Sequence, residues 1–281
     1  MLGHEAIRRF ARAFEVHASV KSVADAARFG LPAELHAFDA YELGRLPGLL
    51  EAARPEVTVN CIGIVKQLED ASRPSAAIAI NSLFPHRLAE ECAAYGCRLI
   101  HVSTDCVFSG SLPLGRAYTE DDVPDARDLY GLTKLLGEVT AAPALTLRTS
   151  IIGWELQRAV GLLAWFVETA DQHVRGYTNA VFSGLTTLAF SDVLLEIALS
   201  HPGLTGLYHV AAEPISKFDL LQMINSRLGL DREIERVDEP VINRALDASR
   251  LRAATGTDAP SWEEMLDEYL LRDREMHEAN A

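Results

Sequence analysis

Apolar residues along the chain gather in short runs, separated by longer segments with helical spacing. The runs are nearly all apolar or β-branched and end at Gly or polar residues, which is typical of buried parallel strands; they cover 16–22, 34–39, 56–63, 98–108, 144–153 and 206–212. Helical spacing covers 5–14, 23–29, 75–94, 128–141, 161–169 and 187–199. The alternation predicts an α/β fold, a doubly wound parallel sheet with helices on both faces.

After Pro214 the pattern changes to a helix, a short strand at 233–238 and a polar stretch that ends in SWEEMLDEYL. Ser261 and Glu264 have the spacing of a capping box, in which each side chain bonds the other residue's backbone N–H. The strand alternation has ended at this point. We therefore expect a smaller C-terminal lobe beside the sheet.

Composition excludes several classes of protein. With 281 residues and 48% hydrophobic content, the chain can bury a large core, and its net charge of −14 disfavours nucleic-acid binding. Neither a signal-peptide pattern nor a run of about 18 apolar residues occurs, so we expect a cytoplasmic protein without a membrane span. The four cysteines and nine histidines have no metal-ligand spacing, so no metal is expected, and His101 is interpreted as a core residue.

Polar side chains with acid–base chemistry follow the predicted strands, where ligands of open α/β sheets bind. Thr104 closes the strand at 98–108, and Tyr130 and Lys134 begin the helix after the next loop, with Asp128 as its N-cap. At a spacing of four, the phenol and the ammonium share one helix face, where the positive charge should lower the phenol's pKa. Such a pair also occurs by chance on solvated helices, so its position beside Thr104 is what favours proton delivery to a carbonyl.

The ordered motifs STDCVFSG, YTEDD, YGLTK, GE and LRTSIIG resemble an extended short-chain dehydrogenase/reductase, close to the dTDP-4-dehydrorhamnose reductases. The resemblance implies a Rossmann-like dinucleotide-binding domain over 1–153 and 186–212, and a substrate-binding lobe over 154–185 and 213–281. It also implies that Tyr130 is the general acid, that Lys134 lowers its pKa and holds the nicotinamide ribose, and that Thr104 orients the carbonyl.

The resemblance further implies a nicotinamide cofactor and a nucleotide-sugar substrate. Lys21 and Ser22 follow the second strand of the family's fold and suit the 2′-phosphate of NADPH, with NADH as the alternative if Lys21 only faces water. The full set of expected cofactor residues is Gly3, Lys21, Ser22, Asp39, Cys61, Ile62, Gly63, Asn81, Tyr130, Lys134 and Thr149. Asn81 either supports the active site or satisfies nearby backbone, and Gly63 could simply end a strand.

For the substrate, the expected contacts are Asp105, Val107, Trp154, Arg175 and Phe182, with Lys66 and the segment 179–186 as further candidates. Arg175 offers bidentate hydrogen bonds to a diphosphate, although loop arginines are often solvated.

One departure concerns the glycine-rich turn. Gly3 matches the last glycine of the family's GxxGxxG, and the two earlier glycines and the strand before them are absent from the sequence. Either about ten native residues lie upstream of Met1, which we favour, or the chain is truncated and binds cofactor weakly. The fold should then show two rows of unpaired backbone groups where that strand would lie.

These observations predict an NADPH-dependent reductase of a 4-keto nucleotide-sugar in deoxysugar or surface-polysaccharide biosynthesis, with a homodimer as one option for its assembly. Two alternatives stay open. The first is a nucleotide-sugar epimerase or dehydratase on the same scaffold. The second is a non-catalytic regulatory subunit, as in methionine adenosyltransferase, which the incomplete glycine turn would favour.

Overall fold

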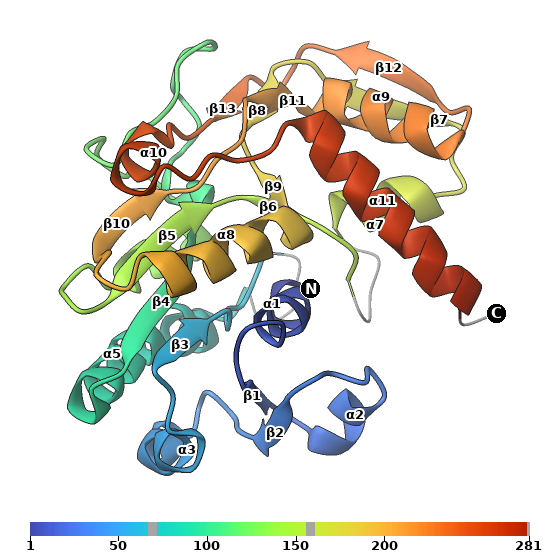
Figure 1. The fold of residues 1–281 in the computed structure, drawn as a ribbon. Helices are drawn as coiled ribbons and strands as arrows, with labels where there is room; N and C mark the ends of the chain where they lie inside the picture. The colour runs from blue at the N-terminus through green and yellow to red at the C-terminus, as the bar shows by residue number, and fades with distance from the viewer. Residues whose placement is uncertain (67–71, 156–160, 280–281) are drawn as a thin grey trace.

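The central element of the fold is a four-stranded parallel sheet in the order β10-β5-β4-β3 (Figure 1). The computed structural model describes residues 1–66, 72–155 and 161–279. The sheet strands are β3 (Val57–Asn60), β4 (Arg98–Thr104), β5 (Leu145–Thr149) and β10 (Gly206–His209). The predicted α/β class with a parallel sheet is confirmed.

Helices cover both faces of this sheet, because successive strand residues point to opposite sides. Ile100 packs in one apolar cluster with side chains of α1 and α8, whereas Leu99 packs in a second cluster with side chains of α3 and α5. These helices are α1 (Leu2–Phe10), α8 (Thr187–Ser200), α3 (Leu46–Ala53) and α5 (Phe84–Tyr95). The sheet is therefore packed on both faces, and this packing fixes the positions of the residues at its carboxyl edge.

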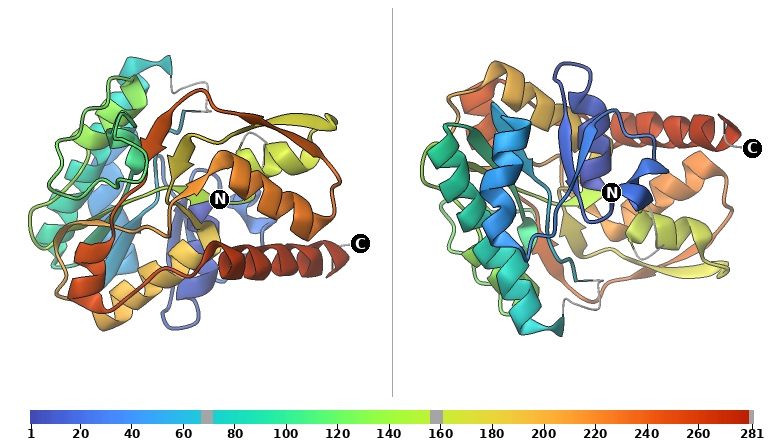
Figure 2. Two further views of the ribbon diagram at one scale, coloured as in Figure 1. Left: turned by 90° about the horizontal axis from the view of Figure 1, so that it is seen from above. Right: turned by 90° about the horizontal axis from the view of Figure 1, so that it is seen from below.

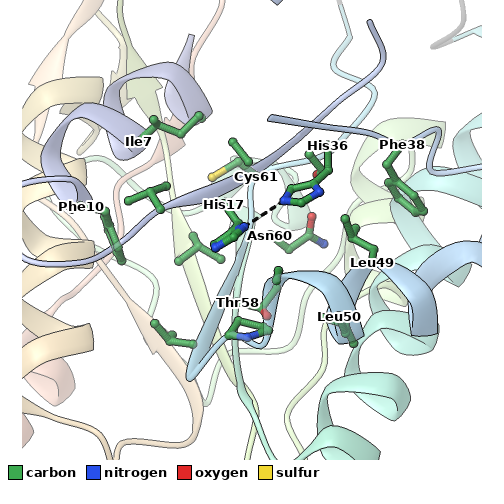
Figure 3. Close-up of a pocket in the computed structure, with 18 of the residues that line it drawn as sticks. Ile7, Phe10, His17, His36, Phe38, Leu49, Leu50, Thr58, Asn60 and Cys61 are labelled. Carbon is green, nitrogen blue, oxygen red and sulfur yellow. Dashed lines mark hydrogen bonds between the residues drawn. The ribbon is translucent and has the colours of Figure 1, made fainter. Parts of the chain in front are cut away.

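A second, two-stranded parallel sheet is formed by β1 and β2, which α2 connects. The bounds are β1 (His17–Val20), α2 (Val23–Ala27) and β2 (Glu34–Ala37). Within the described residues, β1 pairs only with β2, and β3 pairs only with β4. Between β1 and β3 lies a cavity of about 630 Å³, which we call the interstrand cavity (Figure 3). Its walls include Phe10, Val16, His17, His36, Leu50, Val57, Val59 and Phe84.

The C-terminal part builds small sheets beside the main one (Figure 2). Strand β8 lies between β11 and β13, while β7 pairs with β12 and β6 pairs with β9. The strands are β6 (Ile151–Ile152), β7 (His173–Tyr177), β8 (Ala180–Phe182), β9 (Leu185–Thr186), β11 (Ile215–Ser216), β12 (Glu233–Val237) and β13 (Ile242–Arg244). The helices are α7 (Leu162–Glu168), α9 (Lys217–Leu228), α10 (Ser249–Thr255) and α11 (Trp262–Ala279).

The capping box before α11 is confirmed: the Glu264 carboxylate accepts from the Ser261 N–H at 2.9 Å, and the Ser261 hydroxyl accepts from the Glu264 N–H at 3.2 Å. Among the residues that the structure describes, no helix combines the length and apolar character that a membrane crossing requires.

The remaining helical segments lie in the connections between strands. They are η1 (Leu43–Arg45), α4 (Pro74–Ala77), η3 (Ile78–Leu83), η4 (Asp105–Val107) and α6 (Leu129–Leu136). The predicted helix at 75–94 is continuous from α4 to α5, but η3 in its middle is a π-helical segment. Such segments are rare and are frequent at functional sites.

Candidate active site

A cavity of about 570 Å³ opens at the carboxyl edge of the main sheet, and we call it the carboxyl-edge cavity. Its walls come from the start of α1, the segments after β3, β4 and β5, the helix α6, and the strands β8 and β13. The sequence-predicted residues that line it are Gly3, Cys61, Ile62, Gly63, Lys66, Thr104, Asp105, Tyr130, Lys134, Thr149 and Phe182. Ligand binding at this edge is the rule for open α/β sheets.

Helix α6 is fixed at both ends by its sequence. The Asp128 carboxylate caps the first turn by accepting from the Gly131 N–H at 3.0 Å. A side chain at Gly131 would collide with the Cys106 carbonyl, and one at Gly137 would collide with the Asn81 carbonyl. Glycine at these two positions lets the backbone of α6 approach η4 and η3 closely, and this approach sets where Tyr130 and Lys134 point.

Lys134 reaches the cavity from a buried position. Its Nζ donates to the Val102 carbonyl at 2.8 Å, at the end of β4. Burial lowers the pKa of Lys134 to about 8, and the charges of Glu138 and Cys61 partly oppose this shift. The side chain is therefore mainly an ammonium at neutral pH. Since an ammonium has three donors, it can bond a ligand hydroxyl as well as the carbonyl.

Tyr130 differs from the expectation in one respect. The sequence predicts that Lys134 lowers the pKa of the phenol, but the structure raises this pKa, first by burial and then through the neighbouring Cys106 thiol and Asp105 carboxyl. A hydrogen bond with Thr104 acts in the opposite direction and is the smaller effect. The phenol thus keeps its proton well above neutral pH, which is the state that an acid requires.

Thr104 connects the strand end to this acid. Its hydroxyl donates to the Asp105 carboxylate at 3.1 Å and accepts from the Cys106 N–H at 3.1 Å. Asp105 is buried, and burial raises its pKa, while nearby Arg244 and Lys66 lower it. Threonine, carboxyl and phenol therefore form one polar cluster at the cavity wall.

Positive charge is concentrated around this cluster, in contrast to the acidic chain as a whole. Lys66 lies 5.6 Å from the centroid of the Tyr130 ring and pairs with Asp128 at 3.1 Å. Lys217 and Arg244 also line the cavity. Sequence reasoning missed these last two, because α9 and β13 carry no motif; β13 is placed by its pairing with β8, and Lys217 follows β11, which also pairs with β8.

Asn81 lies in the π-helical segment η3, and its side-chain amide forms hydrogen bonds with backbone groups. Its amide accepts from the Ile64 N–H at 2.8 Å and donates to the Ile64 carbonyl at 3.0 Å. It also donates to the Thr133 hydroxyl of α6 at 3.3 Å. Asn81 thereby ties the segment after β3 to the helix of Tyr130, and it does not itself line the carboxyl-edge cavity.

A buried ion pair between β5 and the end of α6 supports the site. The sequence patterns did not predict it. The Arg148 guanidinium on β5 donates two hydrogen bonds of 2.8 Å to the Glu138 carboxylate, directly after α6. Ser103 on β4 donates to the same carboxylate at 2.7 Å. The motif GE and the run LRTS contain these residues, so their charges at apolar positions were the available signal.

Five of the predicted site residues outside the carboxyl-edge cavity have local structural contacts. The Ser22 hydroxyl caps α2, and the Asp39 carboxylate accepts from the Tyr41 N–H at 3.0 Å. Val107 is buried in an apolar cluster. The backbone N–H of Trp154 donates to the Tyr269 hydroxyl at 2.6 Å. Arg175 is 72% exposed on β7, 3.8 Å from Glu235. Lys21 is exposed after β1 and also does not line the cavity.

The donor set at the cavity fits a nicotinamide dinucleotide. The Lys134 ammonium suits ribose hydroxyls, and apolar atoms of Ile62 and Ile151 form a wall for a planar ring. The first turn of α1 borders the cavity at Met1, Leu2 and Gly3, and first-turn N–H groups of a helix favour phosphate.

The parallel sheet with the Tyr130–Lys134 helix at its carboxyl edge defines a Rossmann-like α/β protein. Within this class, the chain belongs to the family described as RmlD substrate binding domain, which it matches over residues 1–274.

Named relatives include a reductase and a subunit of a different enzyme. The chain is 45% identical to a dTDP-4-dehydrorhamnose reductase of Streptomyces griseus over 85 residues, which cover 30% of this chain and 27% of that protein. It is 28% identical to methionine adenosyltransferase 2 subunit beta of Xenopus tropicalis over 225 residues, which cover 72% of this chain and 66% of that protein. The alignments thus span less than two thirds of the length of these relatives.

Solved structures share the fold. A hypothetical dTDP-4-dehydrorhamnose reductase from Sulfolobus tokodaii has a TM-score of 0.76 and 26% identity, over 92% of each chain. The Bacillus anthracis dTDP-4-dehydrorhamnose reductase in complex with NADP has a TM-score of 0.76 and 18% identity, over 92% of this chain and 100% of that one. The Bordetella bronchiseptica enzyme WbmG in complex with NAD and UDP has a TM-score of 0.78 and 17% identity, over 96% and 91%.

Proposed function

We propose that this chain is an NADPH-dependent reductase of a 4-keto nucleotide-sugar, similar to the dTDP-4-dehydrorhamnose reductases. The observation that carries the proposal is the convergence of Thr104, Tyr130 and Lys134 on one cavity rimmed by Lys66, Lys217 and Arg244. The first three residues match the chemistry of a carbonyl, and the cations match the diphosphate of a nucleotide-sugar.

In the proposed reaction, the substrate's keto oxygen accepts a hydrogen bond from the Tyr130 phenol and one from the Thr104 hydroxyl, whose proton turns to it from Asp105. The reduced nicotinamide, when bound, supplies the hydride that reaches the keto carbon. Tyr130 then donates its proton to the oxygen, which becomes the product's hydroxyl. Lys134 would hold the ribose of the bound cofactor through the donors that its ammonium does not use on Val102.

On the cofactor, Lys21 and Ser22 support NADPH over NADH through their suitability for a 2′-phosphate. The Bacillus anthracis structure contains NADP and WbmG contains NAD, so the fold accommodates either type in related proteins. Fluorescence titration with both reduced cofactors tests this choice. A Lys21→Ala chain should bind NADPH up to about fivefold more weakly and NADH unchanged, since one exposed charge pair contributes up to about 1 kcal/mol.

The test of the activity is NADPH oxidation by the purified chain in the presence of dTDP- or UDP-linked 4-keto-6-deoxy sugars. Turnover with a reduced sugar as product supports the proposal. Net cofactor consumption separates a reductase from an epimerase, because an epimerase regenerates its nicotinamide. Isolation of an epimerised sugar without NADPH loss would replace the proposal with that alternative.

A non-catalytic regulatory role is the second candidate. It is suggested by the 28% identity to methionine adenosyltransferase 2 subunit beta over 225 residues and by the interstrand cavity beside α1. This candidate predicts cofactor binding without turnover on any keto sugar of the screen. It also predicts that Tyr130→Phe leaves every measured property of the chain unchanged.

A further inference from the structure

Two histidines outside the carboxyl-edge cavity face each other on the small β1-β2 sheet. The parallel register places His17 opposite Glu34, and His36 lies two residues further along β2, on the same face as Glu34. Their rings are nearly parallel, and His17 Nδ1 lies 2.9 Å from His36 Nε2. Figure 3 shows the two rings pointing toward each other at the interstrand cavity.

The Glu34 carboxylate completes a triangle of ligand atoms. One of its oxygens lies 3.9 Å from His17 Nδ1, and the other lies 3.7 Å from His36 Nε2. Around a tetrahedral Zn²⁺ with bonds of about 2.0–2.2 Å, ligand atoms are separated by roughly 3.3–3.5 Å. The three observed separations bracket this value, so small rotations of the side chains would place all three groups on one ion.

The surroundings also suit a metal ion. The His17 and His36 side chains are 20% and 17% exposed, whereas Glu34 is 65% exposed. The two imidazoles are thus held in place by the fold, while the carboxylate side remains open to solvent for a water ligand. Imidazole together with carboxylate suits Zn²⁺, Cu²⁺ and Ni²⁺ better than Mg²⁺ or Ca²⁺, which prefer oxygen ligands alone.

We propose that His17, Glu34 and His36 form a binding site for a divalent metal ion of the Zn²⁺ class. The ion would replace the proton now shared between the two ring nitrogens. Its structural effect would be to join β1 to β2, and a two-stranded sheet has little stability of its own. The proposal does not depend on the proposed reductase function, because none of the three residues lines the carboxyl-edge cavity.

The test is a Co²⁺ titration of the full chain, purified without a histidine tag and treated with chelator, followed by visible absorbance. The expected result is saturable binding of one equivalent with the bands of a tetrahedral site. His17→Gln and His36→Gln should each weaken binding at least tenfold, and Glu34→Gln should weaken it less. His173→Gln is the matched control, because His173 also pairs with a carboxylate, Glu233, at 2.8 Å but has no second histidine beside it.

A second measurement covers the case in which a histidine variant does not fold. Zn²⁺ should raise the melting temperature of the wild-type chain in a concentration-dependent way. The increase at a given Zn²⁺ concentration should be smaller in Glu34→Gln, whose exposed side chain can change without disturbing the core. The proposal is overturned if the wild-type chain shows no saturable Co²⁺ binding, if binding is the same in His36→Gln, or if it is lost in His173→Gln.

Discussion

The carboxyl-edge cavity and the interstrand cavity have similar volumes, about 570 and 630 Å³, but their walls are formed by different kinds of contact. The carboxyl-edge cavity is surrounded by titratable groups that hydrogen bonds and ion pairs hold in place, such as Lys134 on Val102. The interstrand cavity is bounded by the facing edges of β1 and β3, by apolar side chains such as Phe10 and Leu50, and by the histidines of the small sheet. Hydrogen bonds thus fix the side chains that would deliver the proton, whereas the region beside α1 is loosely packed around a cavity.

The largest expected effect is on catalysis at the carboxyl-edge cavity. Tyr130→Phe removes the proton donor and should lower the reductase kcat by about 10²- to 10⁴-fold. Its melting temperature should remain close to that of the wild type. Tyr95→Phe is the control, since Tyr95 is 44% exposed on α5, and its kcat should not change. Equal turnover by Tyr130→Phe and wild type would remove Tyr130 from the mechanism.

The next effect concerns stability behind the same cavity. Glu138→Gln leaves the buried Arg148 guanidinium without its carboxylate and should lower the free energy of unfolding by about 3–5 kcal/mol. Glu90→Gln breaks an exposed pair with Arg87 and should cost about 0–1 kcal/mol. Urea unfolding of the two variants measures the difference. Equal losses would mean that the Glu138–Arg148 pair does not support the site.

A matched pair of core substitutions compares the packing of the two regions directly. Leu147→Ala, in the main sheet, should cost near the upper end of the usual range of about 2–5 kcal/mol. Leu50→Ala, on the wall of the interstrand cavity, should cost near the lower end, because Leu50 has fewer neighbours to lose on its cavity side. The same loss at both positions, measured by urea unfolding, would contradict the described difference in packing.

The smallest effect is on pH dependence. The pKa of Lys134 is lowered from 10.5 to about 8, so the ammonium is lost as pH rises through about 8. The rate should then fall by up to about tenfold per pH unit, while Tyr130 stays protonated.

The contribution of Lys134 to the free energy of unfolding should change in the opposite direction, because it should increase with pH. Between pH 8 and 10.5 the unfolded chain binds more protons than the folded one at this residue, so its contribution rises with pH. Rate and urea profiles from pH 7 to about 10 measure both, and a rate that stays constant through pH 9 would contradict the assignment.

Local signals in the sequence predicted the strand and helix alternation, the Asp128 cap and the Ser261–Glu264 box, because each depends on neighbours within a few residues. The raised pKa of Tyr130 was not predictable in this way, since it depends on burial by groups that come together only in the fold. Arg244 and Arg175 illustrate the same limit. Both are arginines on short strands, and only strand pairing decides that the first lines the cavity and the second is exposed beside Glu235.

The most direct test of the central claim, that Tyr130 and Lys134 serve hydride reduction of a keto sugar, follows a deuterium atom. The chain is incubated with NADPH that carries deuterium at the transferred position and with a dTDP- or UDP-linked 4-keto-6-deoxy sugar, and the product is analysed by mass spectrometry. The account predicts a product with one deuterium at carbon 4 for the wild type and only trace amounts for Tyr130→Phe. A chain that binds NADPH but transfers no deuterium to any keto sugar of the screen would contradict it.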